Sequence, residues 1–201
     1  MEINFLTLNE NKTEIIIFGQ SELLDGFNSV LGPLASYSRP SVRNLGVIFD
    51  NCFKFDKQIS SVVKTSFFQL RLLGKVKAYL PSKEFEQLIH LFITSRLDYC
   101  NSLYIGVDKC LIRRLQLVQN AAARLLTGKR RYDHITPVLA DLHWLPVSYR
   151  IQFKYLLVVF KSLHGLAPHY LSELLHRHAP ARALRSAQQN MLVVPRCRKK
   201  P

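Results

Sequence analysis

The stretch Asp108–Gly128, DKCLIRRLQLVQNAAARLLTG, decides the fold because its apolar residues recur every three or four positions. The residues of this stripe are Leu111, Leu115, Val118, Ala122 and Leu125. That period matches one face of an α-helix, so the stretch predicts an amphipathic helix with a buried stripe. Asp108 stands where the helix begins, and Gly128 is the residue type favoured just after a helix ends.

Helical patterns flank this stretch on both sides. The further segments expected to be helical are 56–80, 82–96, a short one from Thr136, one after Pro146 that ends at Gly165, and one from Pro168. Prolines and glycines separate them, as is usual at helix boundaries. The helix after Pro146 is expected to turn an apolar stripe inward, made of Phe153, Leu156, Leu157, Phe160 and Leu163.

The N-terminal part has a different pattern. A run rich in β-branched residues reaches Phe18 and Gly19, and a second short apolar run covers Val42–Phe49. We expect two strands there that pair with each other. The fold class is therefore mainly α with a small N-terminal β hairpin. The tail 179–201 has scattered arginines and no stripe, and is expected to be poorly ordered.

Positive charge is concentrated in the second half of the chain. Residues 1–100 carry 11 Lys+Arg against 10 Asp+Glu, whereas residues 101–201 carry 17 against 4, which accounts for most of the net +14. Such an excess predicts a polyanionic partner, nucleic acid or an anionic membrane. The longest segment without a charged residue, Gly26–Ser38, is too short to span a bilayer. With no secretory signal at Met1, we expect an intracellular protein, nuclear or cytoplasmic and not secreted.

The basic residues of two predicted helices gather on faces opposite their apolar stripes. The candidate nucleic-acid-binding residues are Arg113, Arg114, Arg124, Lys129, Arg130 and Arg131 on the first helix and its end, and Arg150 and Lys154 on the second. Residues 109–132 hold seven basic residues and no Asp or Glu. Arginine forks match phosphate oxygens, so these faces favour a duplex backbone bound without base readout. The alternative is an ordinary solvated face.

The residues needed for catalysis are missing. A polymerase or nuclease needs carboxylates that hold two metal ions, and no Asp-Asp pair occurs in the chain. No phosphate-binding loop, zinc-protease helix or serine elbow occurs either. Four separated cysteines fit neither a disulfide framework nor a zinc ribbon, and are interpreted as buried or incidental thiols. We predict no metal and no cofactor for this chain.

Seven segments stand out along the chain: Leu6–Glu14, Leu45–Asp50, Ser95–Asn101, Leu115–Arg124, His134–Pro137, Leu142–Pro146 and Gly165–Pro168. Taken in this order, they resemble segments of the reverse transcriptases of non-LTR retrotransposons of the LINE class, in jockey- and L2-like elements. The first resembles the segment that follows the catalytic Y-x-D-D box, and the second the primer-grip strand. The order of the series makes the resemblance specific, since each segment alone is weak.

The resemblance implies a partial right-hand polymerase: the end of the palm followed by a helical thumb. It implies a palm remnant with the primer-grip strand over 1–52, a thumb-like helical region over 53–128, a basic post-thumb helical region over 129–178 and a basic tail over 179–201. Lys12 would correspond to a lysine that protonates the leaving pyrophosphate, and Gly46 and Val47 to the strand that steadies the primer end. The Y-x-D-D box is absent, so this chain alone is not expected to polymerise DNA, and the Mg²⁺ of the parent enzyme has no site here.

For the chain without the Y-x-D-D box, we therefore expect a capacity to bind RNA or an RNA/DNA duplex through its phosphates. The missing part of the palm is expected to be a second partner if it were supplied. Two alternatives stay open. The helices could form a protein-interaction or structural module without nucleic acid, or the chain could be the non-functional product of a decayed element. Reversing the charges of Arg113, Arg114 and Arg124 distinguishes the interaction module from nucleic-acid binding, because only a nucleic-acid-binding chain should then lose its affinity for a duplex.

Overall fold

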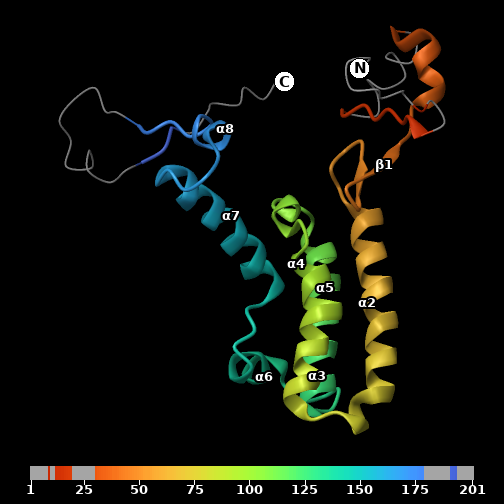
Figure 1. Cartoon of the computed structure of the whole chain (residues 1–201), viewed down its shortest axis with the longest axis vertical. Helices are drawn as coiled ribbons and strands as arrows, with labels where there is room; N and C mark the ends of the chain where they lie inside the picture. The colour runs from red at the N-terminus through yellow and green to blue at the C-terminus, as the bar shows by residue number, and fades with distance from the viewer. Residues whose placement is uncertain (1–8, 10–11, 20–29, 179–190, 194–201) are drawn as a thin grey trace. The chain divides into compact units, whose positions relative to one another are not determined.

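The computed structural model describes residues 9, 12–19, 30–178 and 191–193 of the chain (Figure 1). The chain forms two compact units, 1–151 and 152–201, which are described separately below. The described residues are mainly helical with one two-stranded antiparallel sheet, which confirms the coarse fold prediction. Their elements are a 3₁₀-helix Gly32–Tyr37, β1 Ser41–Asn44, β2 Val47–Asp50, α2 Asp56–Val76, a 3₁₀-helix Lys77–Tyr79, α3 Ser82–Ile89, a π-helix His90–Thr94, α4 Ser95–Asp98, a 3₁₀-helix Asn101–Tyr104, α5 Lys109–Thr127, α6 Ile135–Asp141, α7 Val147–Leu163 and α8 His169–Ser172.

The sheet is a local hairpin, and its pairing differs from the predicted one. β1 pairs with β2, with Ser41 opposite Asp50 and Asn44 opposite Val47. Leu45 and Gly46 form the two-residue turn, with φ of 47° and 85°. The expected pairing of the run before Gly19 with Val42–Phe49 is wrong, because the second run folds back on itself; Ile15 forms only an isolated bridge with Ser38. A two-residue loop costs less chain entropy to close than a long one, and Gly46 tolerates the positive φ.

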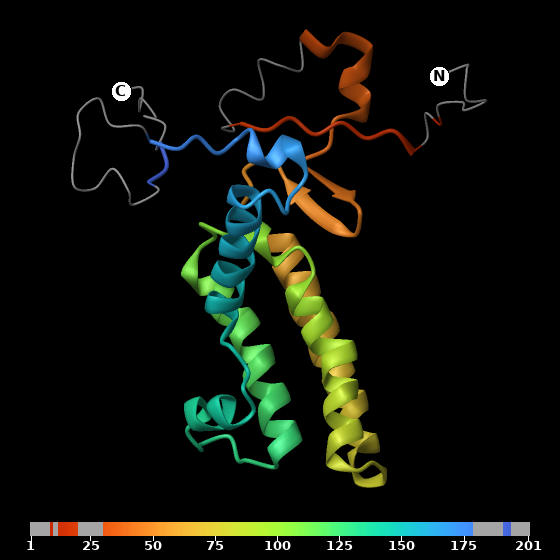
Figure 2. The same ribbon diagram turned by 60° about the vertical axis from the view of Figure 1, so that its left-hand side comes forward.

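The turn between β2 and α2 is held by the carboxylate of Asp50, the last residue of β2. Asp50 accepts hydrogen bonds from three backbone N–H groups of the following turn, those of Cys52 (3.1 Å), Lys54 (2.9 Å) and Phe55 (2.5 Å). This turn holds Phe55 in the left-handed region with φ of 59° and buries its ring to 2% exposure. The helix predicted over 56–80 is confirmed, and its apolar residues Ile59, Leu70 and Leu73 are buried. Figure 1 shows α2 as one long helix, and in the view of Figure 2 the segment from α3 to α4 lies in front of it.

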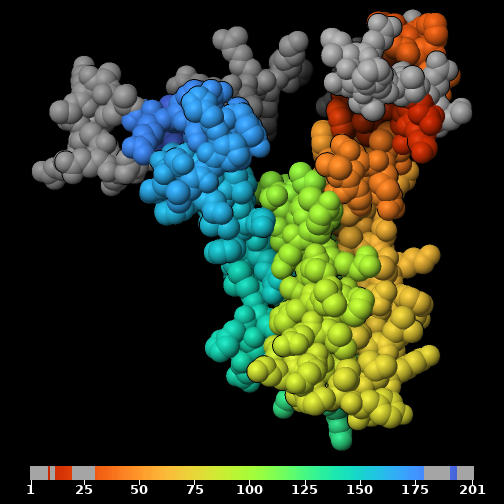
Figure 3. All heavy atoms as spheres, in the orientation of Figure 1, coloured from red at the N-terminus to blue at the C-terminus, as the bar shows by residue number. Residues whose placement is uncertain are grey.

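The second predicted helix, from Ser82 to about Arg96, is confirmed as one continuous helical segment from α3 to α4. A π-turn at His90–Thr94 interrupts its α-helical hydrogen bonding. Every fourth residue of it is buried: Phe85, Ile89, Ile93 and Leu97. This segment and α5 both pack against α2, and these contacts form the hydrophobic core of the first unit. In the all-atom view of Figure 3, the atoms of α2 and of the segment from α3 to α4 lie against one another.

α5 follows its sequence pattern closely. Asp108 is the N-terminal cap residue and Gly128 ends the helix in the left-handed conformation with φ of 71°. Of the predicted stripe, Leu111, Leu115, Val118 and Ala122 are buried. α6 packs against α5, and Trp144, in the segment that follows α6, is 5% exposed. The first unit therefore contains the predicted palm remnant and thumb-like region together with the start of the post-thumb region.

The predicted inward stripe of α7 is wrong for three of its five residues, and the other two, Leu157 and Leu163, are half-buried. Phe153, Leu156 and Phe160 are 61%, 61% and 53% exposed. Periodicity identifies a helix with an apolar face, but it carries no information about what covers that face. Within the second unit, the Ser172 hydroxyl of α8 donates to the Ser162 carbonyl of α7 at 3.0 Å.

Three further findings concern the predictions about membranes, cysteines and the tail. Among the described helices, none is both long and apolar enough to cross a bilayer. Cys52, Cys100 and Cys110 are free and exposed, so of the two interpretations, buried or incidental thiols, burial is wrong for these three. The tail predicted over 179–201 lies outside the described residues except for 191–193, where Leu192 bridges Arg177.

Candidate nucleic-acid interface

The three predicted arginines of α5 have different surroundings. Arg113 is exposed. Arg114 is half-buried, and its Nη2 donates to the Ser60 hydroxyl of α2 at 3.1 Å. Arg124 is also half-buried, and its Nη2 donates to the Asp133 carbonyl at 3.4 Å. Of the three, Arg113 is the one whose guanidinium is fully presented to solvent.

The basic segment after α5 is exposed over Lys129, Arg130 and Arg131. The backbone N–H of Arg130 donates to Asp133 Oδ2 at 2.7 Å. The stretch 109–132, which has no Asp or Glu, is thus followed directly by Asp133, whose carboxylate accepts a hydrogen bond from the backbone of that stretch. No ion pair of the three side chains occurs within the described part of the chain, so their charges face solvent.

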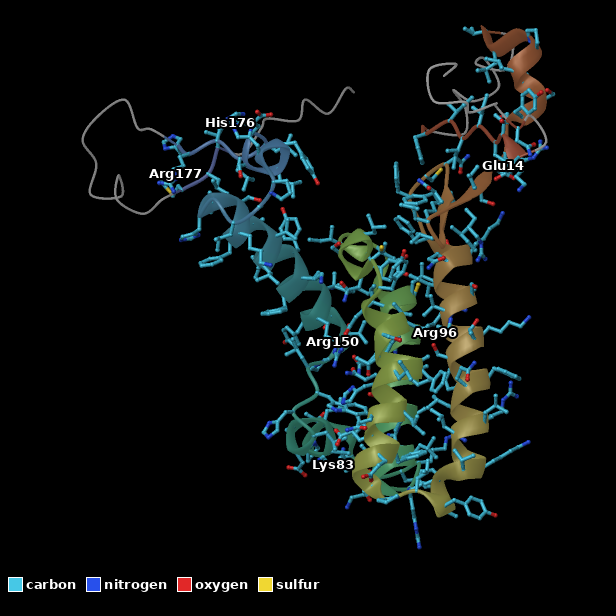
Figure 4. All side chains as sticks on the ribbon, in the orientation of Figure 1. Glu14, Lys83, Arg96, Arg150, His176 and Arg177 are labelled. Carbon is cyan, nitrogen blue, oxygen red and sulfur yellow. The ribbon has the colours of Figure 1, made fainter. Side chains whose placement is uncertain are left out.

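The two predicted basic residues of α7 also differ. Arg150 lies in the first unit with its side chain 17% exposed, and its Nη1 forms an ion pair with Asp98 Oδ2 at 2.6 Å (Figure 4). Its Nε donates to the Leu145 carbonyl at 2.8 Å. Lys154 lies in the second unit and is exposed. The structure therefore assigns Arg150 a role in holding α7 to α4.

The residues identified by the resemblance lie in and beside the hairpin. Gly46 is exposed at its turn, whereas Val47 is 2% exposed and belongs to the core. Lys12 is exposed and lines a hollow on the hairpin together with Glu14 and Arg43. Val47 can therefore position the turn but cannot contact a ligand with its side chain.

A polar pocket of about 550 Å³ lies where the hairpin meets α2 and α4, and sequence reasoning missed it. We call it the arginine pocket; its lining residues are Arg43, Gly46, Gln58, Ser61, Val62, Thr65, Ser95, Arg96 and Tyr99. No Asp or Glu lines it. Considering the described residues alone, the guanidinium group of neither Arg43 nor Arg96, the latter labelled in Figure 4, makes a hydrogen bond or an ion pair. No local signal connects Arg43 with Arg96, since they are far apart in sequence.

The walls of the arginine pocket are held by hydrogen bonds to backbone. Tyr99 Oη donates to the Leu45 carbonyl at 2.6 Å, which fixes the hairpin turn to the end of α4. The buried Gln58 accepts from the Ile48 N–H at 3.0 Å and so ties β2 to α2. Arg43 of β1 and Arg96 of α4 therefore line a pocket whose walls are joined by these hydrogen bonds. Two arginines in one pocket without a carboxylate suit an oxyanion such as a phosphate.

Comparison with protein-family models, with curated proteins and with solved structures found no match for this chain. In the described part of the chain, no group of three His, Cys, Asp or Glu side chains comes close enough together to hold a metal ion.

Proposed function

We propose that this chain is the end of the palm and the thumb of a non-LTR reverse transcriptase, and that it binds the phosphate backbone of RNA or of an RNA/DNA duplex. The observation that carries the proposal is the arginine pocket, which Arg43 and Arg96 line together with Gly46 and which no Asp or Glu lines. Gly46 is the residue that the resemblance assigns to the primer-holding strand. The ordered motifs of the sequence and the exposed Arg113 and Lys129–Arg131 support the same partner.

The geometry of the guanidinium group suits a phosphate. A guanidinium offers N–H donors in a planar fork that pairs with two oxygens of one phosphate. Neither guanidinium forms an ion pair with a carboxylate of the described residues, so no carboxylate of the protein competes with a phosphate at this pocket. Each backbone phosphate neutralised also releases counterions, which makes affinity depend on salt.

The proposed activity is binding and not catalysis. The metal-holding carboxylates of the parent family are absent from the sequence, so Lys12 has no pyrophosphate to protonate in this chain alone. We place the protein inside the cell, where its nucleic-acid partner occurs. The missing palm would be a second partner if it were supplied as a separate chain.

The test is a titration of a labelled RNA/DNA duplex with the full chain at several salt concentrations. Contacts to three to five phosphates give a log-log salt slope of roughly −3 to −5. Arg43→Glu combined with Arg96→Glu should make the slope shallower by about two and lower the affinity at every salt concentration. The matched control is Arg71→Glu with Lys75→Glu, which reverses two exposed charges on α2 outside the pocket. Absent binding, or an equal effect of both pairs, contradicts the proposal.

The exposed apolar face of α7 favours a second candidate, a helical protein-interaction module. Phe153, Leu156 and Phe160 present a large apolar area of the kind that marks contact sites. Under this candidate, reversing Arg113, Arg43 or Arg96 leaves the protein's binding properties unchanged. Under this candidate, replacing Phe153 and Phe160 with Ser abolishes binding of the chain to its protein partner. Under the first candidate, the same double replacement leaves the affinity for the RNA/DNA duplex at the wild-type value.

A further inference from the structure

A second pocket lies between α5 and α6, away from the hairpin, and two motifs of the sequence converge on it. Its volume is about 700 Å³, and we call it the α5–α6 pocket. It is lined by Asn120 of α5, by Thr136 and Leu139 of α6, by Trp144 of the segment after α6 and by Ser148 of α7. His134–Pro137 and Leu142–Pro146, two of the ordered motifs, supply most of this lining. The proposed function gives neither motif a role.

The backbone at the pocket is held in an uncommon conformation. His143 has a positive φ of 55°, and its N–H donates to the Ala140 carbonyl at 2.9 Å. The next N–H, that of Trp144, donates to the Leu139 carbonyl at 2.8 Å. This turn puts the imidazole of His143 on the exposed rim and buries the indole of Trp144. Non-glycine residues held at positive φ occur often at binding sites, where the surrounding structure stabilises the strain.

The pocket is chemically suited to an uncharged ring. Leu139 and Trp144 are each 5% exposed and form apolar wall, while Thr136 and Ser148 add hydroxyls. No Asp, Glu, Lys or Arg lines it. Apolar walls with a few polar groups at the edge are typical of sites that bind a flat heterocycle.

A chain of side-chain amides orients one hydrogen-bond donor at the pocket. The Val147 N–H donates to Gln116 Oε1 at 2.9 Å, which leaves Gln116 Nε2 to donate to Asn120 Oδ1 at 2.8 Å. Asn120 therefore accepts with its oxygen and presents its NH₂ group. That NH₂ group makes no hydrogen bond to any described residue. It is a fixed donor for an acceptor atom at the edge of a ring.

Positive charge lies on the same face of α5 as this donor. Arg113 lies seven residues before Asn120, and Arg124 lies four residues after it. Both offsets return to nearly the same angle around an α-helix, so the three residues share one face. Phosphates held by these arginines would place the attached bases near Asn120. A ligand with an uncharged flat ring and a phosphate backbone fits both observations.

We propose that the α5–α6 pocket accepts an unpaired nucleobase of a bound RNA strand, with its edge on Asn120 and its ring among Leu139 and Trp144. This inference rests on the proposed function and adds a site for single-stranded RNA to it. Unstacked bases in protein pockets are the usual means of recognising single-stranded RNA.

Trp144 is the single tryptophan of the chain, so its fluorescence reports on this pocket. The experiment compares a short single-stranded RNA with an abasic ribose-phosphate oligomer of the same length, both titrated into the full chain. The RNA should bind roughly tenfold more tightly and change the Trp144 emission, as expected for one base packed against side chains. The abasic oligomer should bind through its phosphates without changing the emission.

Two substitutions locate the effect. Ala140→Leu fills the pocket with a non-aromatic side chain and should remove the preference for the base-containing strand; Ala78→Leu, at an exposed alanine outside the pocket, should not. Asn120→Asp keeps an oxygen for Gln116 Nε2 but loses the NH₂ donor, and should lower the preference about fivefold, as for one hydrogen bond. Because the preference is a ratio of two affinities, it removes the general effect of the added negative charge.

The outcomes separate this inference from the proposed function. Equal affinity for both oligomers with unchanged Trp144 emission overturns the base pocket and leaves backbone binding standing. A preference that survives in both Ala140→Leu and Asn120→Asp overturns it too, because the base is then held elsewhere. If neither oligomer binds, the proposed function fails and the inference fails with it.

Discussion

Arg150 Nη1 and Asp98 Oδ2 lie 2.6 Å apart and join the first turn of α7 to the end of α4. The arginine also donates through Nε to the Leu145 carbonyl at 2.8 Å, and Asn101 Nδ2 donates to the other oxygen of Asp98 at 3.3 Å. Both partners of the ion pair therefore have further hydrogen bonds that fix their geometry. A pair fixed in this way contributes more to stability than a freely moving surface pair.

We predict that Arg150→Ala destabilises the first unit by about 1–3 kcal/mol, because Asp98 and the Leu145 carbonyl both lose a charged donor. Urea unfolding followed by Trp144 fluorescence measures the change. Lys154→Ala, four residues further along α7 and exposed, should change the free energy of unfolding by less than about 0.5 kcal/mol. Equal midpoints for the two variants would show that the ion pair has no stabilising role.

We predict that Asp50→Asn destabilises the protein by about 1–3 kcal/mol. The carboxylate accepts three backbone hydrogen bonds at the entry to α2, and the asparagine would place its own NH₂ group against one of these donors. Asp108→Asn is the matched control, because Asp108 makes no side-chain cap hydrogen bond. Thermal unfolding of both variants tests the prediction, which fails if their melting temperatures fall by the same amount.

Burial raises the pKa of Tyr104 above the ordinary tyrosine value of 10.0; a hydrogen bond with Gln58 lowers it in part, and the charge of Cys100 raises it. The folded state therefore holds this proton more tightly than the unfolded state. Its contribution to stability is complete below pH about 10 and is lost as the pH rises through the folded pKa.

We predict that the free energy of unfolding falls less steeply above pH about 10 in Tyr104→Phe than in the wild type. Tyr132→Phe removes a 92% exposed phenol and serves as the control, with a wild-type pH dependence. Urea unfolding at a series of alkaline pH values measures the slopes. A wild-type slope in Tyr104→Phe would mean that the phenol titrates alike in the folded and unfolded chains.

Local sequence patterns predicted the helices because the determinants of α5 are themselves local. Its stripe, its N-terminal Asp108 and its terminal Gly128 lie within one stretch, and the structure places all three as expected. The hairpin pairing failed for a related reason. The apolar pattern is compatible both with pairing between the run before Gly19 and Val42–Phe49 and with a hairpin inside Val42–Phe49. The turn at Leu45-Gly46 decides for the hairpin, but only one of its two positions, Gly46, holds a residue that strongly favours such a turn.

The candidate site was less predictable because it depends on distant residues. A helical face shows which arginines point away from an apolar stripe, but not that Arg150 meets Asp98 or that Arg114 meets Ser60. Arg43 and Arg96 come together only once the hairpin packs beside α2 and α4. Pairings of this kind follow from tertiary packing, which single-sequence periodicity does not contain.

The hairpin turn also offers a stabilising substitution. Leu45 is 84% exposed and has φ of 47°, so its side chain gains little from burial while its backbone occupies the left-handed region. Asparagine tolerates that region better than leucine, and Asn-Gly is the preferred pair in a two-residue hairpin turn of this kind. The bond from Tyr99 Oη to the Leu45 carbonyl is to backbone and is kept on substitution.

We therefore predict that Leu45→Asn raises the free energy of unfolding by about 0.5–1 kcal/mol. Leu45→Val should lower it, because a β-branched side chain fits the left-handed region worse than leucine does. Urea midpoints of the two variants and the wild type measure the order. If asparagine destabilised the protein as much as valine, the exposed Leu45 side chain would be stabilising the fold through a contact of its own, and the turn would not be the source of strain.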